Sequence, residues 1–204
     1  LLKNFGEFDI FFSFRSSYRS KLIKTLVKAE VKYQYNKKRS NGSHQVEKYN
    51  NFINSSLNIN SIPGKLKLYS EKKVNSGGKK LLGINPGASY GSAKRWYPKE
   101  FASVAIDLSS DYDMILFGGP EEKEITKDIE NYLTDNDISN YQNLAGMTTL
   151  NELMTNIASL DLLITGDSGP MHIAAAFQVP TVTIFGPTKD KETCQWMNEK
   201  SIIV

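Results

Sequence analysis

Residues 160–188 read LDLLITGDSGPMHIAAAFQVPTVTIFGPT, and this stretch decides the fold. Its apolar runs predict a strand over Leu160–Thr165, a helix over Ser168–Phe177 and a second strand over Thr181–Phe185. A strand, a helix and a strand in immediate succession favour a parallel pair of strands joined by a right-handed crossover. The stretch therefore predicts the α/β fold class.

The residues before this stretch follow the same alternation. Strands are expected over Leu81–Asn85 and Met114–Phe117, and helices over Pro98–Ser109, Glu121–Leu133 and Leu150–Ala158. Repeated alternation of this kind predicts a parallel sheet with helices on both faces. Such sheets bind ligands at the carboxyl ends of their strands, so the turns that follow the strands are the candidate site.

The first third of the chain is less regular. Its patterns predict a strand over Phe8–Phe14, a helix from Ser16 to Ala29, a strand over Val31–Tyr35, and a helix over His44–Ile53 with Ser43 as its N-cap.

Composition and chain ends bear on the domain organisation. From Asn54 to Lys80 the sequence is rich in Asn, Ser, Lys and Gly, which is typical of a linker. We therefore expect two domains, at residues 1–72 and 73–204. The chain begins with Leu1 instead of Met and ends in the apolar run Ser201–Val204, which has the pattern of a strand start. These ends lead us to expect a fragment of a longer protein.

Charge and cysteine content exclude several classes of protein. The 204 residues carry a formal net charge of +3 and contain one cysteine, Cys194. A single cysteine excludes an internal disulfide framework and a cysteine-ligated zinc site, and it favours a reducing compartment. The basic residues do not form the dense stripe of a nucleic-acid binder. No apolar stretch approaches the roughly 18 residues that a membrane span needs.

The turn after Leu81–Asn85 is the first candidate for ligand binding. Residues 86–96 read PGASYGSAKRW, and small residues such as Ser89 let the backbone approach an anion. Lys94 and Arg95 supply positive charge. The spacing of a Walker loop is missing, so a phosphate-contacting loop of another kind is expected. The alternative is a surface loop with solvated cations.

The turn Gly166–His172 leads directly into an apolar helix. The free N–H groups and the dipole of a helix N-terminus favour a phosphate there. Asp167 is expected to cap the helix, to accept a hydrogen bond from a ribose or sugar hydroxyl, or to do both. His172 lies four residues after Ser168 and can face the same ligand. The alternative is a plain N-cap with His172 packed in the protein.

Two further turns complete the pattern. Glu122 is expected to accept hydrogen bonds from a ribose diol, or else only to stabilise a helix start. Met147 is expected to cover an adenine face, or else to belong to the core. The turn Phe185–Thr188, which contains Gly186, would close the floor of a pocket. Four strand-end turns on one edge predict a nucleotide-diphosphate site, but the motifs of a dehydrogenase and of an α/β-hydrolase are absent from the sequence.

Together these motifs resemble, in order, those of the bacterial ADP-heptose:lipopolysaccharide heptosyltransferases of glycosyltransferase family 9. The form PGASYGSAKRW is most similar to the members that add the second inner-core heptose. The resemblance is strong over Leu81–Thr188 and weaker over Phe8–Phe52. The segments that carry it are NPGA (85–88), AKRW (93–96), LFGG (116–119), NLAG (143–146), DSGPMH (167–172) and FGPT (185–188).

The resemblance implies a GT-B glycosyltransferase with two Rossmann-like domains, each built on a parallel sheet. The N-terminal domain, only partly present, would bind the acceptor, and the C-terminal domain would bind the nucleotide-sugar donor. Lys94 would contact the donor diphosphate, Glu122 the ribose and Met147 the adenine region. The implied donor-binding set is Ser89, Lys94, Arg95, Glu122, Met147, Asp167, Ser168, Gly169, His172 and Gly186.

The resemblance also implies a reaction, the inverting transfer of heptose from ADP-heptose to the lipopolysaccharide inner core without a metal or other cofactor. The base would be an Asp in an N-terminal loop outside this sequence, so no catalytic residue is assigned. Arg15 and Arg19 are expected to bind the anionic glycolipid acceptor, or else to belong to a solvated basic face of the helix Ser16–Ala29. The protein would be a cytoplasmic monomer in peripheral contact with the inner face of the inner membrane.

Two alternatives remain open at this point. One is another family 9 core glycosyltransferase with a different sugar donor or acceptor. The other is a nucleotide-sugar binding module without catalysis.

Overall fold

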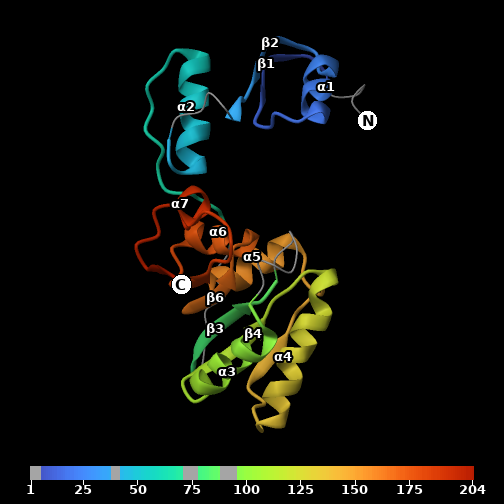
Figure 1. Ribbon diagram of the computed structural model, residues 1–204, viewed down its shortest axis with the longest axis vertical. Coiled ribbons are helices and arrows are strands. Elements are labelled where there is room, and N and C mark those ends of the chain that lie inside the picture. The colour runs from blue at the N-terminus through green and yellow to red at the C-terminus, as the bar shows by residue number, and fades with distance from the viewer. Residues whose placement is uncertain (1–5, 38–41, 71–77, 88–95) are drawn as a thin grey trace. The chain divides into compact units, whose positions relative to one another are not determined.

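The computed structural model (Figure 1) describes residues 6–37, 42–70, 78–87 and 96–204. The chain divides into two compact units, Leu1–Gly64 and Lys65–Val204. The expected domain boundary, between residues 72 and 73, lies outside the described residues. Among the described residues, no helix is both long enough and apolar enough to cross a lipid bilayer.

The first unit is a parallel strand–helix–strand motif followed by a second helix. Its elements are β1 (Phe8–Ser13), α1 (Tyr18–Leu26), β2 (Ala29–Gln34) and α2 (Gln45–Leu57). The two strands pair in parallel, with Phe8 opposite Ala29 and Ser13 opposite Gln34. Aromatic rings join α2 to the segments beside the strands: Phe14 and Tyr49 lie 5.0 Å apart between ring centroids. Edge-to-face packing of this kind anchors a helix on a small sheet.

The start of α2 differs from the sequence prediction. Its N-cap is His44, whose Nδ1 accepts a hydrogen bond from the Val46 N–H at 3.1 Å, so Ser43 is not the cap. Ser43 instead donates its hydroxyl to the Glu47 carboxylate at 2.9 Å, and the same carboxylate accepts the His44 N–H at 3.0 Å. The prediction was wrong because His is a rare capping residue and the geometry of this turn decides between neighbours.

The second unit is built on a six-stranded, fully parallel sheet with the order β5-β4-β3-β6-β7-β8. This is the doubly wound order of dinucleotide-binding sheets, in which the strand order reverses between the first and fourth strands, here β3 and β6. The strands are β3 (Lys80–Asn85), β4 (Tyr112–Leu116), β5 (Tyr141–Asn143), β6 (Leu162–Gly166), β7 (Thr181–Ile184) and β8 (Ser201–Ile203).

Helices cover both faces of this sheet, as the alternation predicted (Figure 1). One core contains Phe101, Ile129 and Leu133 from the helices of one face, and the other contains Ile157 and Ala174 from the opposite face. Burial of these side chains against the strands holds the layers together. The helices are α3 (Pro98–Leu108), η4 (Pro120–Glu122), α4 (Lys123–Asp135), α5 (Leu150–Ala158), α6 (Gly169–Phe177) and α7 (Asp190–Thr193).

Two elements were absent from the sequence prediction. β5 has the letters YQN and no apolar run, and it becomes a strand because it pairs in parallel with β4 from Met114 to Leu116. α7 is a single turn of polar residues. Short elements of this kind are decided by their neighbours in space, since they have too few residues to show a period. The expected strand start at Ser201 is confirmed by β8.

Candidate functional site

A cavity of about 290 Å³ lies at the carboxyl edge of the sheet, where the strand order reverses. Residues from the turns after β3, β4, β5 and β6 meet around it. The sequence predicted three of these turns; the described lining contains the turn after β5 and no residue of the turn Phe185–Thr188, which was expected to close the floor. The position is the one at which doubly wound sheets bind their ligands. The lining includes Asn85, Gly87, Gly118, Gly119, Pro120, Glu122, Gly146, Thr148, Thr149, Ser168, Gly169 and Pro170.

Glu122 connects two of these turns. Its Oε2 accepts a hydrogen bond from the Gly119 N–H at 2.7 Å, which caps the short helix η4. Its carboxyl group also lies directly against Gly87, where an added Cβ would overlap it. The side chain therefore has the helix-stabilising role that the sequence analysis gave as an alternative. Binding of a ribose stays a prediction, and Glu122 is placed on the cavity wall where it would do so.

Ser168, and not Asp167, is the N-cap residue of α6. Within the described part of the chain, the Ser168 side chain makes no capping hydrogen bond to α6. Its Oγ lies instead 3.1 Å from Asn85 Nδ2, 3.1 Å from Thr165 Oγ1 and 3.2 Å from the Gly166 carbonyl oxygen. The hydroxyl is thus directed toward the ends of β3 and β6.

The N-terminus of α6 lies at the cavity. Pro170 occupies the second helical position and has no N–H, so the donors of the first turn come from Gly169 and Met171. Ser168, Gly169 and Pro170 all line the cavity. The partial positive charge of a helix N-terminus attracts anions such as a phosphate group. The arrangement is suited to hold a diphosphate.

Three further predicted residues, Asp167, His172 and Gly186, are not on the described wall of the cavity. Asp167 is half-buried, and its Oδ2 accepts the Thr188 hydroxyl at 2.9 Å, which ties the turn after β6 to the turn after β7. His172 is half-buried in α6, and Gly186 is exposed in the turn after β7. None of these three is among the described residues that line the cavity.

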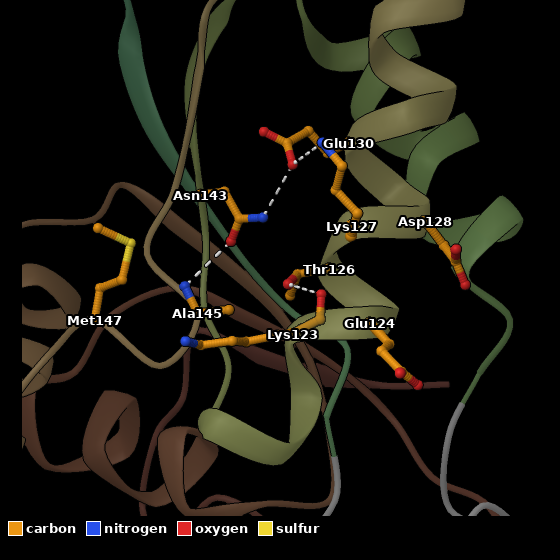
Figure 2. A pocket seen from close by; sticks show the side chains of 9 residues that line it. All are labelled: Lys123, Glu124, Thr126, Lys127, Asp128, Glu130, Asn143, Ala145 and Met147. Atoms are coloured by element: carbon orange, nitrogen blue, oxygen red, sulfur yellow. Dashed lines mark hydrogen bonds and ion pairs between the residues drawn. The ribbon is translucent and has the colours of Figure 1, made fainter.

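A second, larger hollow of about 740 Å³ lies beside α4 (Figure 2). Its described wall consists mostly of side chains of α4, many of them charged, whereas turns after four strands meet at the smaller cavity. Met147 lines it and is 70% exposed, so the interpretation of this side chain as core is wrong. Gly146 has φ +66°, a left-handed backbone conformation that favours glycine, and a Cβ added there would overlap the Lys123 side chain. Gly146 lines the smaller cavity, whereas its neighbours Ala145 and Met147 line the larger hollow.

Hydrogen bonds hold the turn that carries Met147 (Figure 2). Asn143 Oδ1 accepts the Ala145 N–H at 3.1 Å, and Asn143 Nδ2 donates to Glu130 at 3.4 Å. Lys127 in turn pairs with Glu130 at 3.1 Å. The chain from α4 to Ala145 fixes the direction of this turn and leaves the Met147 side chain free to cover a flat group.

The basic residues expected to bind ligands fall into two groups. Ser89, Lys94 and Arg95 lie outside the described residues. Arg15 and Arg19 are exposed on the first unit, one after β1 and the other in the first turn of α1. The Arg15 carbonyl accepts the Ser20 hydroxyl at 2.8 Å, so the local turn is held while the guanidinium reaches solvent.

Asn85, which lines the cavity, and its buried partner Thr165 were not singled out from the sequence. Asn85 Nδ2 donates to Thr165 Oγ1 at 3.0 Å, and the two side chains are 3% and 0% exposed. Both are polar residues inside apolar strand patterns, at the last or next-to-last position. A buried polar group at a strand end is the signal that would have pointed to them.

A known protein family matches almost the whole chain. Residues 5–204 match the description "Glycosyltransferase family 9 (heptosyltransferase)". The chain belongs to glycosyltransferase family 9. The resemblance seen in the sequence motifs is therefore confirmed, and the cavity lies in the second unit of a family 9 protein.

One family 9 relative is the lipooligosaccharide heptosyltransferase 2 of Campylobacter jejuni, which is 43% identical over 100% of this chain and 66% of its own length. The chain thus spans just under two thirds of that relative. A second relative is the lipopolysaccharide heptosyltransferase 2 of Escherichia coli, 37% identical over 53% of this chain and 31% of its own length.

The solved structure of E. coli ADP-heptose lipopolysaccharide heptosyltransferase II covers 96% of this chain and 68% of its own, with a TM-score of 0.81 and 24% identity. This likeness shows the fold, and it confirms the predicted α/β class of GT-B type. In the described stretches of this family 9 chain, no group of three or more His, Cys, Asp or Glu side chains is arranged to hold a metal ion.

Proposed function

We propose that the protein is an inverting glycosyltransferase that moves heptose from ADP-heptose to the inner core of lipopolysaccharide; relatives named lipooligosaccharide or lipopolysaccharide heptosyltransferase 2 support the heptose transfer. The observation that carries the proposal is the cavity at the strand reversal, which is lined both by Glu122 and by the N-terminal residues of α6, a helix whose N-cap side chain makes no capping hydrogen bond. The partial positive charge of the helix N-terminus suits the diphosphate of a nucleotide sugar, and the carboxylate suits the hydroxyls of its ribose.

Each part of the donor has a proposed contact. The diphosphate lies at the N-terminus of α6 and takes further positive charge from Lys94 and Arg95. The ribose hydroxyls donate to Glu122, which has lone pairs left after it accepts the Gly119 N–H. The adenine extends toward Met147, whose exposed thioether covers a flat ring.

The proposed chemistry is a single displacement. The acceptor hydroxyl oxygen attacks the anomeric carbon, the bond from that carbon to the diphosphate breaks, and the hydroxyl proton passes to a carboxylate base. The negative charge that develops on the departing ADP is stabilised by the N–H groups of α6 and by the nearby cations, so metal is not required. We assign the base to no residue of this chain.

The acceptor side of the proposal rests on Arg15 and Arg19. Both are exposed on the first unit, and a planar guanidinium pairs well with phosphate or carboxylate groups. We propose that they bind the anionic inner-core glycolipid. A glycolipid acceptor would bring a cytoplasmic, monomeric protein into peripheral contact with the inner membrane.

A transfer assay tests the proposal. The full-length protein is incubated with ADP-heptose and an inner-core acceptor that carries one heptose, and the product is detected by mass. Parallel reactions replace the donor by ADP-glucose and the acceptor by one without heptose. Transfer only with the first pair supports the proposal. Transfer with another pair favours a different family 9 activity, and ADP binding without any transfer favours a binding module.

A further inference from the structure

Asn85 lies at the centre of a buried hydrogen-bond cluster between β3 and β6. It is 3% exposed, and its Nδ2 donates to Ser168 Oγ at 3.1 Å, to Thr165 Oγ1 at 3.0 Å and to the Gly87 carbonyl at 3.4 Å. Two hydrogens shared among three acceptors hold the amide in one orientation. The cluster therefore joins the turn after β3 to the residue that begins α6.

Three contacts hold the Ser168 hydroxyl away from the capping position: Asn85 Nδ2 donates to its oxygen at 3.1 Å, Thr165 Oγ1 lies 3.1 Å away, and the Gly166 carbonyl accepts its proton at 3.2 Å. Ser is among the preferred N-cap residues because its oxygen accepts an N–H from the second or third helical position. Ser168 already has the extended backbone of a capping residue, with φ −151° and ψ 173°. The backbone therefore needs no change for capping, but the side chain must rotate and leave its contacts with Asn85, Thr165 and Gly166.

Capping by Ser168 would remove a donor from the cavity. The second helical position is Pro170, which has no N–H, so the cap would have to take the N–H of Met171. An anion at this helix end would then be left with the N–H of Gly169 in the first turn. The competition between Ser168 and an anion is decided by where the Ser168 hydroxyl is held.

We propose that Asn85 is a positioning residue for donor binding, because it holds the Ser168 hydroxyl away from α6 and keeps the Met171 N–H free for the donor diphosphate. This inference rests on the proposed function of the cavity. It predicts that the helix end caps itself when the Asn85 amide is removed. ADP binding then has to displace the cap.

The test compares Asn85→Ala, Ser168→Ala and the double variant with the wild-type protein. Asn85→Ala should weaken ADP binding in calorimetry by about fivefold, the equilibrium equivalent of a typical N-cap. The double variant should return to within about twofold of Ser168→Ala, because no hydroxyl remains to compete. Asn198→Ala is the matched control, since Asn198 is also buried and donates to a carbonyl, that of Val179, at 2.9 Å.

Amide hydrogen exchange gives a readout that does not depend on ADP. The protein has 5 methionines, so labelling with 15N-methionine resolves Met171 in a simple spectrum. Exchange at Met171 should slow in Asn85→Ala and recover in the double variant. Circular dichroism confirms that each variant is folded.

The outcomes separate the inference from the proposed function. A wild-type protein that does not bind ADP, with the expected exchange pattern, would overturn the donor proposal and leave the positioning of Ser168 supported. Wild-type ADP binding with equally weak binding in Asn85→Ala and the double variant would overturn the inference. Unchanged exchange at Met171 in Asn85→Ala would overturn it as well.

Discussion

Replacing Gly87 with alanine should destabilise the second unit through Glu122. Gly87 is buried, and its φ is not in the left-handed region, so its own backbone accepts alanine. The added Cβ would overlap the Glu122 carboxyl group, which must then move and give up its hydrogen bond from the Gly119 N–H at 2.7 Å. A hydrogen bond to a charged group contributes about 1.5–3 kcal/mol.

That loss corresponds to a fall of about 3–12 °C in the thermal midpoint for a unit of this size. The assay is thermal unfolding of four proteins: wild type, Gly87→Ala, Glu122→Ala and the double variant. Glu122→Ala removes the same hydrogen bond, so Gly87→Ala should cost less than about 0.5 kcal/mol in that background. Gly64→Ala is the control, because nothing lies within 4 Å of its added Cβ.

Two results would refute this reasoning. One is a Gly87→Ala protein as stable as the wild type, which would mean that Glu122 moves without loss. The other is an equal cost of Gly87→Ala with and without the Glu122 side chain, which would place the clash elsewhere. If Glu122 also binds the ribose, Gly87→Ala and Glu122→Ala should each weaken ADP binding, whereas Gly64→Ala should not.

Four further predictions concern the donor, metal, pH and acceptor. Lys94→Ala should weaken ADP binding by roughly 1.5–3 kcal/mol in calorimetry, and unchanged affinity would contradict its role as an anchor. Transfer activity should survive EDTA; loss that magnesium or iron restores would show that metal stabilises the diphosphate. The backbone N–H of His44 lowers the pKa of Glu47 below its ordinary value of 4.5, so its stabilisation is present above that pH and lost below it. In Glu47→Gln the free energy of unfolding, measured with urea, should therefore fall less steeply as the pH is lowered. An unchanged pH profile would show that the Glu47 carboxylate does not cause the loss of stability in acid. Charge-removing substitutions at Arg15 and Arg19 should raise the acceptor KM and leave the donor KM nearly unchanged. A rise in the donor KM instead would show that these arginines do not bind the acceptor.

The sequence by itself determined most of the second unit's element types and the edge that carries the site. Apolar runs and helical periods are local patterns, so α5 was predicted with its observed bounds, Leu150–Ala158, and the strands other than β5 within a few residues. Small and polar residues directly after the strands marked the edge where the cavity lies, because parallel strands all end on the same side. Family membership followed from the same turns.

Only the tertiary structure decided which of these residues touch. Asn85 and Thr165 are 80 positions apart and bond because β3 and β6 are neighbours in the sheet, an order that no local pattern contains. The strand β5 exists through its pairing with β4, and the Ser168 hydroxyl contacts the amide of Asn85 from another strand and makes no capping bond to α6. The physical reason is that a hydrogen bond needs its donor and acceptor within about 3 Å, and only the packed sheet brings distant residues that close.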